Sequence, residues 1–423
     1  MLLDDHIDDF ASFISASPSS FHAVAEAARR LDAAGFTRLE ETDEWAATDT
    51  ARAYVVREGA IIAWVRPADA TPTTPFRILG AHTDSPGLKA KPDPRLDAHG
   101  WNQVAVEVYG GPLLNSWLDR ELELAGRLVT RDGSEHLVRT GPYLRLPQLA
   151  IHLDRAANDG LALDKQRHTQ PIFGVVGDGS GTEGDILTHL ASLAGIDPAD
   201  VVGHDLITVD TAAPQRFGAG QGLFAAPRMD NLTSVHAALL ALLDAPADAP
   251  HTSVLAAFDH EEIGSETRSG ACGPFLEDVL VRLSGGTATE LRRAYAASWH
   301  VSSDVGHSVH PNYAERHDPT HHPLAGSGPL LKVNANQRYA TDGPGAALWA
   351  RCCDTAGTTA QPFVSNNTVP CGSTTGPLTA TRLGIRTVDV GAPLLSMHSA
   401  RELVHVRDVV ALSGAIGAFF AGA

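Results

Sequence analysis

The chain has 423 residues, 43% of them hydrophobic and 19% charged, and its formal net charge is -18 at pH 7. This length exceeds that of one ordinary domain and allows a large buried core, so we expect two or three modules. The acidic balance and the lack of any basic stripe argue against binding to nucleic acid, which depends on clustered Lys and Arg. No apolar run is long enough to span a bilayer, the acidic N-terminus is unlike a signal peptide, and the four cysteines form no paired spacing. We therefore expect a cytoplasmic protein without membrane contact.

The first 90 residues alternate predicted helices and strands. Apolar positions at helical spacing predict helices in DDHIDDFASFIS and FHAVAEAARRLDAAGF, and a hairpin is expected from ARAYVVRE and AIIAWVRP. The segment FRILGAHTD has the pattern of a buried strand that ends in polar residues. Such a strand end is the usual place for a site in an open α/β sheet.

The pattern changes between residues 87 and 215. Short strand-like segments such as VAVEVYG, ELELAGRLVT and DLITVD are separated by Gly, Asp or Pro, so we interpret residues 87–215 as an inserted, mainly β domain. The α/β alternation returns at residue 216 and ends in a helix from about Val406. We therefore expect residues 1–86 and 216–423 to form one discontinuous α/β domain.

Side chains that can bind a metal recur where predicted strands end. They are His82 and Asp84 in GAHTDSPG, Asp230 in RMDN, Glu261 and Glu262 in FDHEEIGS, Asp304 in SSDVGH, and His398 in SMHSARE. A mixed set of imidazoles and carboxylates suits Zn²⁺ or a similar divalent ion. Each has a plainer interpretation: Asp230 could cap a helix, and the two glutamates could be a solvated strand end. Their joint occurrence along one α/β alternation favours a single metal cleft.

Six segments, in chain order, resemble motifs of the M18 metallopeptidases, the aspartyl aminopeptidase family. They are GAHTDSPGLKAKP, RMDNL, FDHEEIGS, SSDVGHSVHPNY, LKVNANQRYAT and SMHSARE. The resemblance covers essentially the whole chain. It implies an α/β/α sandwich catalytic domain with a central mixed sheet, of the zinc peptidase type, interrupted by a mainly β dimerisation domain.

The resemblance also implies two zinc ions per subunit, although the same ligands accept Co²⁺ or Mn²⁺. The implied ligands are His82 and Asp304 for one ion, Glu262 and His398 for the other, and Asp230 as the bridge between them. Glu261 is then the general base, which takes a proton from a metal-bridged water as it attacks the peptide carbonyl. Asp84 is expected to assist catalysis by holding the other ring nitrogen of His82.

Substrate contacts and assembly follow from the same resemblance. His307, Lys332 and Tyr339 match positions that contact substrate, and the aspartyl members favour N-terminal Asp or Glu. Because the chain has only four lysines against 28 arginines, Lys332 is a good candidate partner for an acidic P1 side chain, with a solvated strand lysine as the alternative. His152, in LAIHLDR, is implied to reach the active site of a neighbouring subunit in a dimer-based homo-oligomer, with a dodecamer as the family's larger assembly.

The leading hypothesis is therefore a di-zinc aminopeptidase that removes N-terminal residues from peptides and prefers Asp or Glu. One alternative is an M18-like aminopeptidase with a neutral or broad P1 preference. Another is a related co-catalytic zinc carboxypeptidase or deacylase. A non-catalytic assembly protein with the same fold is less well supported, because all five implied ligands and Glu261 are present.

Overall fold

A nine-stranded mixed sheet forms the centre of the larger part of the molecule. The computed structural model describes residues 2–45, 51–177 and 185–423. The strand order is β1-β2-β3-β14-β4-β15-β19-β17-β18. The strands are β1 (Thr37–Arg38), β2 (Arg52–Arg57), β3 (Ala60–Val65), β14 (Thr252–Phe258), β4 (Phe76–His82), β15 (Trp299–Ser303), β19 (Arg386–Gly391), β17 (Leu330–Val333) and β18 (Gln361–Val364). The central strands β14, β4, β15 and β19 pair in parallel.

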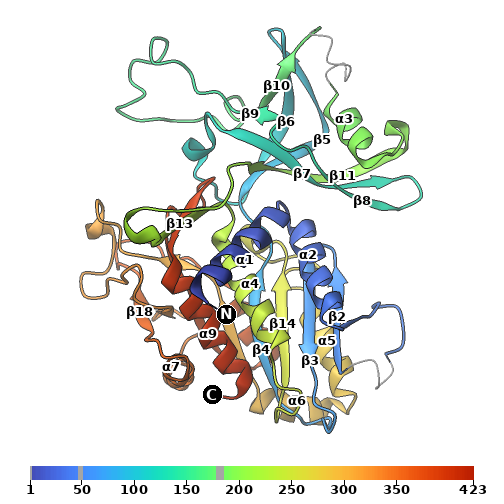
Figure 1. The fold of residues 1–423 in the computed structure, drawn as a ribbon, viewed down its shortest axis with the longest axis vertical. Helices are drawn as coiled ribbons and strands as arrows, with labels where there is room; N and C mark the ends of the chain where they lie inside the picture. The colour runs from blue at the N-terminus through green and yellow to red at the C-terminus, as the bar shows by residue number, and fades with distance from the viewer. Residues whose placement is uncertain (1, 46–50, 178–184) are drawn as a thin grey trace.

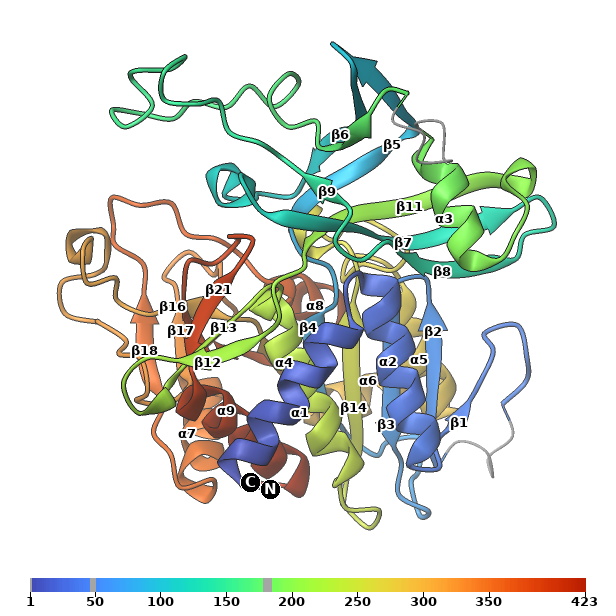
Figure 2. The same ribbon diagram turned by 45° about the horizontal axis from the view of Figure 1, so that its top comes forward.

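Helices cover both faces of this sheet (Figures 1 and 2). On one face lie α1 (Leu3–Ala16), α2 (Ser20–Ala33), α4 (Met229–Leu243), α7 (Gly343–Thr355) and α9 (Val406–Ala421), and on the other lie α5 (Phe275–Ser284), α6 (Ala288–Ala297) and α8 (Thr375–Leu383). Successive side chains of a strand point to opposite faces, so in β3 Ile61 and Ala63 join one core while Ile62 and Trp64 join the other. Every residue of β3 and β14 is buried for this reason. The predicted α/β/α sandwich with a central mixed sheet is confirmed.

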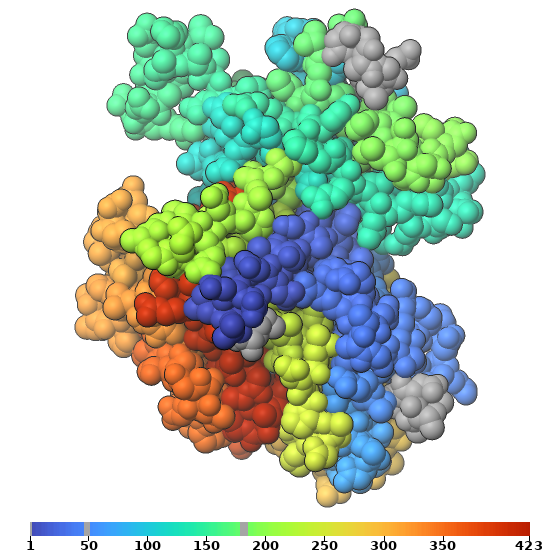
Figure 3. Space-filling view, in the orientation of Figure 1, coloured from blue at the N-terminus to red at the C-terminus, as the bar shows by residue number. Residues whose placement is uncertain are grey.

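A second sheet of seven strands stands on this sandwich and has its own core. Its order is β11-β5-β6-β10-β9-β7-β8, and β11 also pairs with β7, so six of the strands close into a ring and β8 pairs with β7 outside it. The elements are β5 (Gly87–Ala98), β6 (Trp101–Tyr109), β7 (Glu121–Thr130), β8 (Glu135–Arg139), β9 (Leu144–Arg145), β10 (Ile172–Val175), α3 (Ile186–Ala194) and β11 (Val201–Asp210). At Gly126 a Cβ atom would lie 1.8 Å from the carbonyl oxygen of Asp205, so the β11–β7 pairing requires glycine there. These strands lie inside the range 87–215 assigned above to the inserted domain. Figure 3 shows this part standing above the larger body.

A third, five-stranded sheet lies beside the point where the two parts meet, and we did not predict it. Its strands, in order, are β12 (Gln215–Phe217), β13 (Leu223–Ala226), β21 (Glu402–His405), β20 (Pro393–Leu395) and β16 (Gly306–His307). The remaining elements are the short 3-10 turns η1 (Leu114–Trp117), η2 (Pro198–Asp200), η3 (Ala219–Gln221), η4 (Glu261–Ile263) and η5 (Ala314–Arg316). Across the described part of the chain, no helix has the length and apolar character needed to cross a membrane.

Candidate metal centre

Three neighbouring parallel strands bring most of the candidate ligands to one edge of the main sheet. His82 is the last residue of β4, and the register of β14 on β4 sets Phe258 beside it. The turn η4, which carries Glu261 and Glu262, follows β14, and Asp304 directly follows β15 on the other side of β4. Because parallel strands end at the same edge, these side chains gather there, as we predicted from their positions.

The third sheet delivers the other two candidates to the same edge. Asp230 lies just after β13, at the start of α4, and His398 lies in the turn between β20 and β21. Antiparallel pairing of β21 with both β13 and β20 holds these two segments side by side. The five candidate ligands therefore come from five different places in the chain and meet in one cluster.

Asp230 is the centre of this cluster. Its Oδ1 atom lies 3.1 Å from His82 Nε2, and that nitrogen is 3.8 Å from Asp304 Oδ1. Its Oδ2 atom lies 3.3 Å from His398 Nε2, which is 3.4 Å from Glu262 Oε2. The cluster thus contains two pairs of candidate metal ligands, His82 with Asp304 and His398 with Glu262. The first pair lies at one oxygen of the Asp230 carboxylate and the second pair at the other.

The donor set fits a metal ion. Asp230 Oδ1 and Glu262 Oε1 are buried without a well-aligned hydrogen-bond donor among the described residues. Buried carboxylate oxygens normally have a partner, and a cation supplies one where a donor does not. Ligand atoms of His82, Asp230 and Glu262 all lie within 4.8 Å of one another. Imidazole nitrogen and carboxylate oxygen are common zinc ligands in catalytic sites.

The electrostatics of the metal-free cluster lead to the same conclusion. Burial opposes a charged His82, yet hydrogen bonding to the neighbouring carboxylates, Asp230 first, raises its pKa well above the usual value. Burial likewise opposes a charged His398, but Asp230 and Glu262 raise its pKa to about 10. Burial and the charge of Asp230 raise the pKa of Glu262 well above the usual value. Without a cation the cluster therefore takes up protons, which divalent ions would replace.

Glu261 differs from its neighbour Glu262 in its contacts. Among the described residues, no hydrogen bond or ion pair holds the Glu261 carboxylate. The hydrogen bonds of this residue are made by its backbone: the N–H donates to Asp84 Oδ1, and the carbonyl oxygen accepts from the Gly264 N–H. Burial, with the charges of Asp304 and Asp230, raises the pKa of Glu261 to about 8. A carboxylate that no neighbour engages, beside a metal cluster, is available to accept a proton.

Asp84 links His82 to the two glutamates. Its Oδ1 atom accepts a hydrogen bond from the Glu261 backbone N–H at 3.0 Å, and its Oδ2 atom accepts one from the Glu262 backbone N–H at 3.1 Å. His82 Nδ1 is 3.1 Å from the Asp84 carbonyl oxygen and 3.4 Å from its carboxylate. Asp84 therefore contacts the other ring nitrogen of His82, as expected, and in addition clamps the backbone of η4. Burial opposes a charged Asp84, but His82 first, and then hydrogen bonds from the Tyr109 hydroxyl and the Glu262 backbone N–H, hold its pKa below the usual value.

Glu402 is a buried site residue that we did not assign from the sequence. Its Oε2 atom accepts a hydrogen bond from the Asp230 backbone N–H, and its Oε1 atom accepts one from the His398 backbone N–H, both at 2.9 Å. Burial and the charge of Asp230 raise the pKa of Glu402 to about 8. The signal was present in SMHSARE, where an acidic residue follows the candidate ligand by four positions.

The three predicted substrate-contacting residues lie beside the cluster. Lys332 is 2% exposed, and its Nζ atom is 4.0 Å from Asp304 Oδ2 and 5.3 Å from the centre of the Tyr339 ring. His307 and Tyr339 line a cavity of about 510 Å³ together with Arg316, among other residues. None of the described residues that line this cavity is Asp or Glu. The cavity therefore lacks the negative charge that dominates the rest of the chain.

His152 lies apart from the cluster within one chain. It is exposed on the loop that follows β9, and it takes part in none of the cluster contacts among the described residues.

The comparisons with known proteins identify the family of the chain. The family model described as aminopeptidase I zinc metalloprotease (M18) matches residues 13–420. The chain is 57% identical over 425 residues to a probable M18 family aminopeptidase 2 of Streptomyces avermitilis, a match that covers 99% of this chain and 98% of the relative. A cryo-EM structure of the Ape4 and Nbr1 complex has a TM-score of 0.94 at 34% identity, covering 99% of this chain and 86% of that chain. A structure of the S. cerevisiae mApe1 dodecamer has a TM-score of 0.85 at 29% identity, covering 99% and 96%. As the resemblance predicted, this chain is a metallo-aminopeptidase that belongs to the M18 family of zinc peptidases.

Proposed function

We propose that this aminopeptidase uses two zinc ions per subunit, held by His82, Asp230, Glu262, Asp304 and His398. The observation that carries the proposal is the position of the Asp230 carboxylate between two candidate histidine ligands. Its Oδ1 atom lies 3.1 Å from His82 Nε2, and its Oδ2 atom lies 3.3 Å from His398 Nε2. A carboxylate with this surrounding is suited to bridge two ions. When bound, zinc lowers the pKa of a water molecule and stabilises negative charge that develops on a carbonyl oxygen. Cobalt or manganese could replace zinc in the same donor set.

Glu261 acts as the general base in this proposal. Its carboxylate has no partner among the described residues, and its backbone N–H is held by Asp84 at 3.0 Å, so the side chain stays beside the cluster. Glu261 accepts the proton of the attacking water and returns it to the departing amine. Burial and the neighbouring carboxylates raise the pKa of Glu261 to about 8, and a cation held by the cluster would favour its ionised form.

The substrate is proposed to be a peptide with Asp or Glu at its N-terminus. Support comes from the cavity beside the cluster, which has Arg316 and several histidines but no carboxylate among its described lining residues. The Nζ atom of Lys332 lies 5.3 Å from the centre of the ring of Tyr339, which lines this cavity, and 4.0 Å from Asp304 Oδ2. A cation there favours an anionic P1 side chain over a neutral one. A neutral or broad P1 preference is the alternative.

We also propose that the chain forms a homo-oligomer, built from dimers and up to a dodecamer. The loop after β9 exposes apolar side chains at Leu149, Ile151 and Leu153, which are 56%, 43% and 75% exposed. Figure 3 shows the segment near residue 150 projecting from the inserted part. Grouped apolar side chains that remain exposed mark an interaction surface. His152 lies between them, which supports its proposed reach into a neighbouring subunit. The cytoplasmic location stays a prediction.

The test is a panel of peptides that differ only in the N-terminal residue, assayed with purified protein whose zinc content is measured in parallel. The proposal expects about two zinc ions per subunit and the highest kcat/KM for Asp or Glu. Equal kcat/KM across acidic and neutral residues would support the broad-specificity alternative. Hydrolysis of N-acyl amino acids or of C-terminal residues, in place of the panel, would favour a deacylase or carboxypeptidase.

A further inference from the structure

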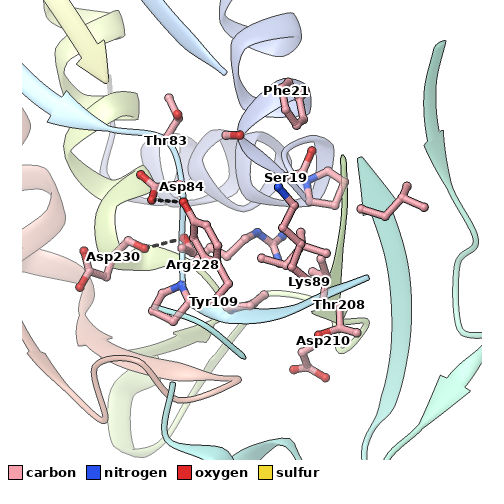
Figure 4. A pocket seen from close by; sticks show the side chains of 18 of the residues that line it. Ser19, Phe21, Thr83, Asp84, Lys89, Tyr109, Thr208, Asp210, Arg228 and Asp230 are labelled. Atoms are coloured by element: carbon pink, nitrogen blue, oxygen red, sulfur yellow. Dashed lines mark hydrogen bonds between the residues drawn. The ribbon is translucent and has the colours of Figure 1, made fainter. Parts of the chain in front are cut away.

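The end of strand β6 belongs to the inserted part but contacts the metal centre. Tyr109, the last residue of β6, donates its hydroxyl to Asp84 Oδ2 at 2.8 Å. Figure 4 shows the Tyr109 side chain pointing toward Asp84, with Asp230 beyond it. The hydroxyl shares its acceptor atom with the backbone N–H of Glu262, which lies 3.1 Å from the same oxygen. A residue of the inserted part thus takes part in the clamp that holds η4.

The next two residues contact the other side of the cluster. Gly110 has a φ of 67°, and a Cβ atom on it would lie 3.2 Å from the Cβ of Glu262, so the backbone passes close against this candidate ligand. The Gly111 carbonyl oxygen is 3.0 Å from His398 Nδ1. A hydrogen bond from Nδ1 to this carbonyl leaves Nε2 free to face Asp230 and Glu262, which is the tautomer that a metal ligand needs.

Asp84 is the point through which Tyr109 can affect the chemistry. The carboxylate is buried, at 5% exposure, and holds the backbone of both Glu261 and Glu262. A buried carboxylate keeps its charge and its orientation only while its hydrogen-bond donors remain. The Tyr109 hydroxyl is the side-chain donor that comes to Asp84 from outside the α/β body.

We propose that Tyr109 is a positioning residue: its hydrogen bond to Asp84 fixes η4, and thereby the placement of Glu261 and Glu262, so that the inserted part completes the active site of its own subunit. This inference rests on the proposed roles of Glu261 and Glu262. It gives the insertion a function in cis that is independent of assembly, because every contact involved lies within one chain.

The first test is Tyr109→Phe, which removes only the hydroxyl. We expect kcat to fall by roughly 10-fold or more with KM nearly unchanged, the size of effect typical of groups that orient a metal site. Tyr54→Phe is the matched control, because the Tyr54 hydroxyl also donates to a carboxylate at 2.8 Å, that of Asp32, away from the cluster. Both variants lose a partly buried hydrogen bond, so both are expected to lose stability. A kcat equal to the wild type in Tyr109→Phe would overturn the proposal.

A second measurement does not depend on catalysis. Hydrogen–deuterium exchange, read by mass spectrometry on a peptide that contains residues 258–265, reports on the amides of Glu261 and Glu262. We expect faster exchange of this peptide in Tyr109→Phe and not in Tyr54→Phe. Equal exchange in wild type and Tyr109→Phe would overturn the positioning role. A wild type without aminopeptidase activity would instead contradict the proposed function, while the exchange comparison would still decide whether Tyr109 holds η4.

Discussion

Replacing Glu261 by Gln tests the proposed base most directly. The two side chains have the same shape, but the amide cannot accept a proton at neutral pH. Among the described residues the Glu261 carboxylate has no hydrogen bond or ion pair, so the substitution breaks no bond that the structure shows. The fold and the zinc content are therefore expected to survive. A loss of turnover would then report the chemistry alone.

The expected loss follows from the role of the group. General-base catalysis contributes about 10²- to 10⁴-fold, which corresponds to about 2.7 to 5.5 kcal/mol of activation free energy. We expect kcat on the best N-terminal residue to fall by at least ~10² in Glu261→Gln, with zinc retained by elemental analysis. Glu266→Gln is the matched control, because Glu266 is exposed in the same loop. A Glu261→Gln enzyme that keeps its zinc and turns over within a fewfold of wild type would refute the assignment of the base.

Three further predictions concern the metals and the P1 side chain. Glu262→Ala should lower the zinc content by about one ion per subunit, and an unchanged content would mean that the two glutamates are assigned the wrong way round. Lys332→Met should reduce kcat/KM for peptides with N-terminal Asp more than for peptides with N-terminal Ala. Lys165→Met, a change in the inserted part, should alter neither value. An equal loss for the Asp and Ala peptides in Lys332→Met would show that Lys332 does not determine the P1 preference. After removal of metal with EDTA, Tm should fall as pH rises from about 7 to 10. Folding raises the pKa of Glu402 to about 8 and that of His398 to about 10, so the metal-free fold is favoured when both groups are protonated. Zinc should abolish this trend, and a flat metal-free profile would contradict the electrostatic account.

The long elements of the α/β sandwich could be predicted because their signals are local. The strand Thr252–Phe258 and the helix Val406–Ala421 each carry an unbroken apolar pattern within one segment. The third sheet had no such signal. Its strands Gly306–His307 and Pro393–Leu395 have two and three residues, too few for any periodicity to appear.

The same division applies to the site. His82, Glu261 and Asp304 could be grouped from sequence because each lies at the end of a predicted buried strand or just after one, and neighbouring parallel strands end at one edge. Contacts between distant segments carry no such pattern. Glu402 meets Asp230 across 172 residues, and Asp84 meets Glu261 across 177. The contacts of Glu402 and Asp84 could therefore be identified only from the three-dimensional structure.

The sequence by itself determined the alternation of helices and strands, the family, and the side chains able to bind metal, because residue type and hydrophobic period are properties of a short stretch of chain. Only the tertiary structure decided that His82 and His398 lie at opposite oxygens of the Asp230 carboxylate, and that Tyr109 reaches Asp84 from the inserted part. Those distances depend on how separate sheets pack against one another. Packing is set by the sum of many distant contacts, and no single segment encodes it.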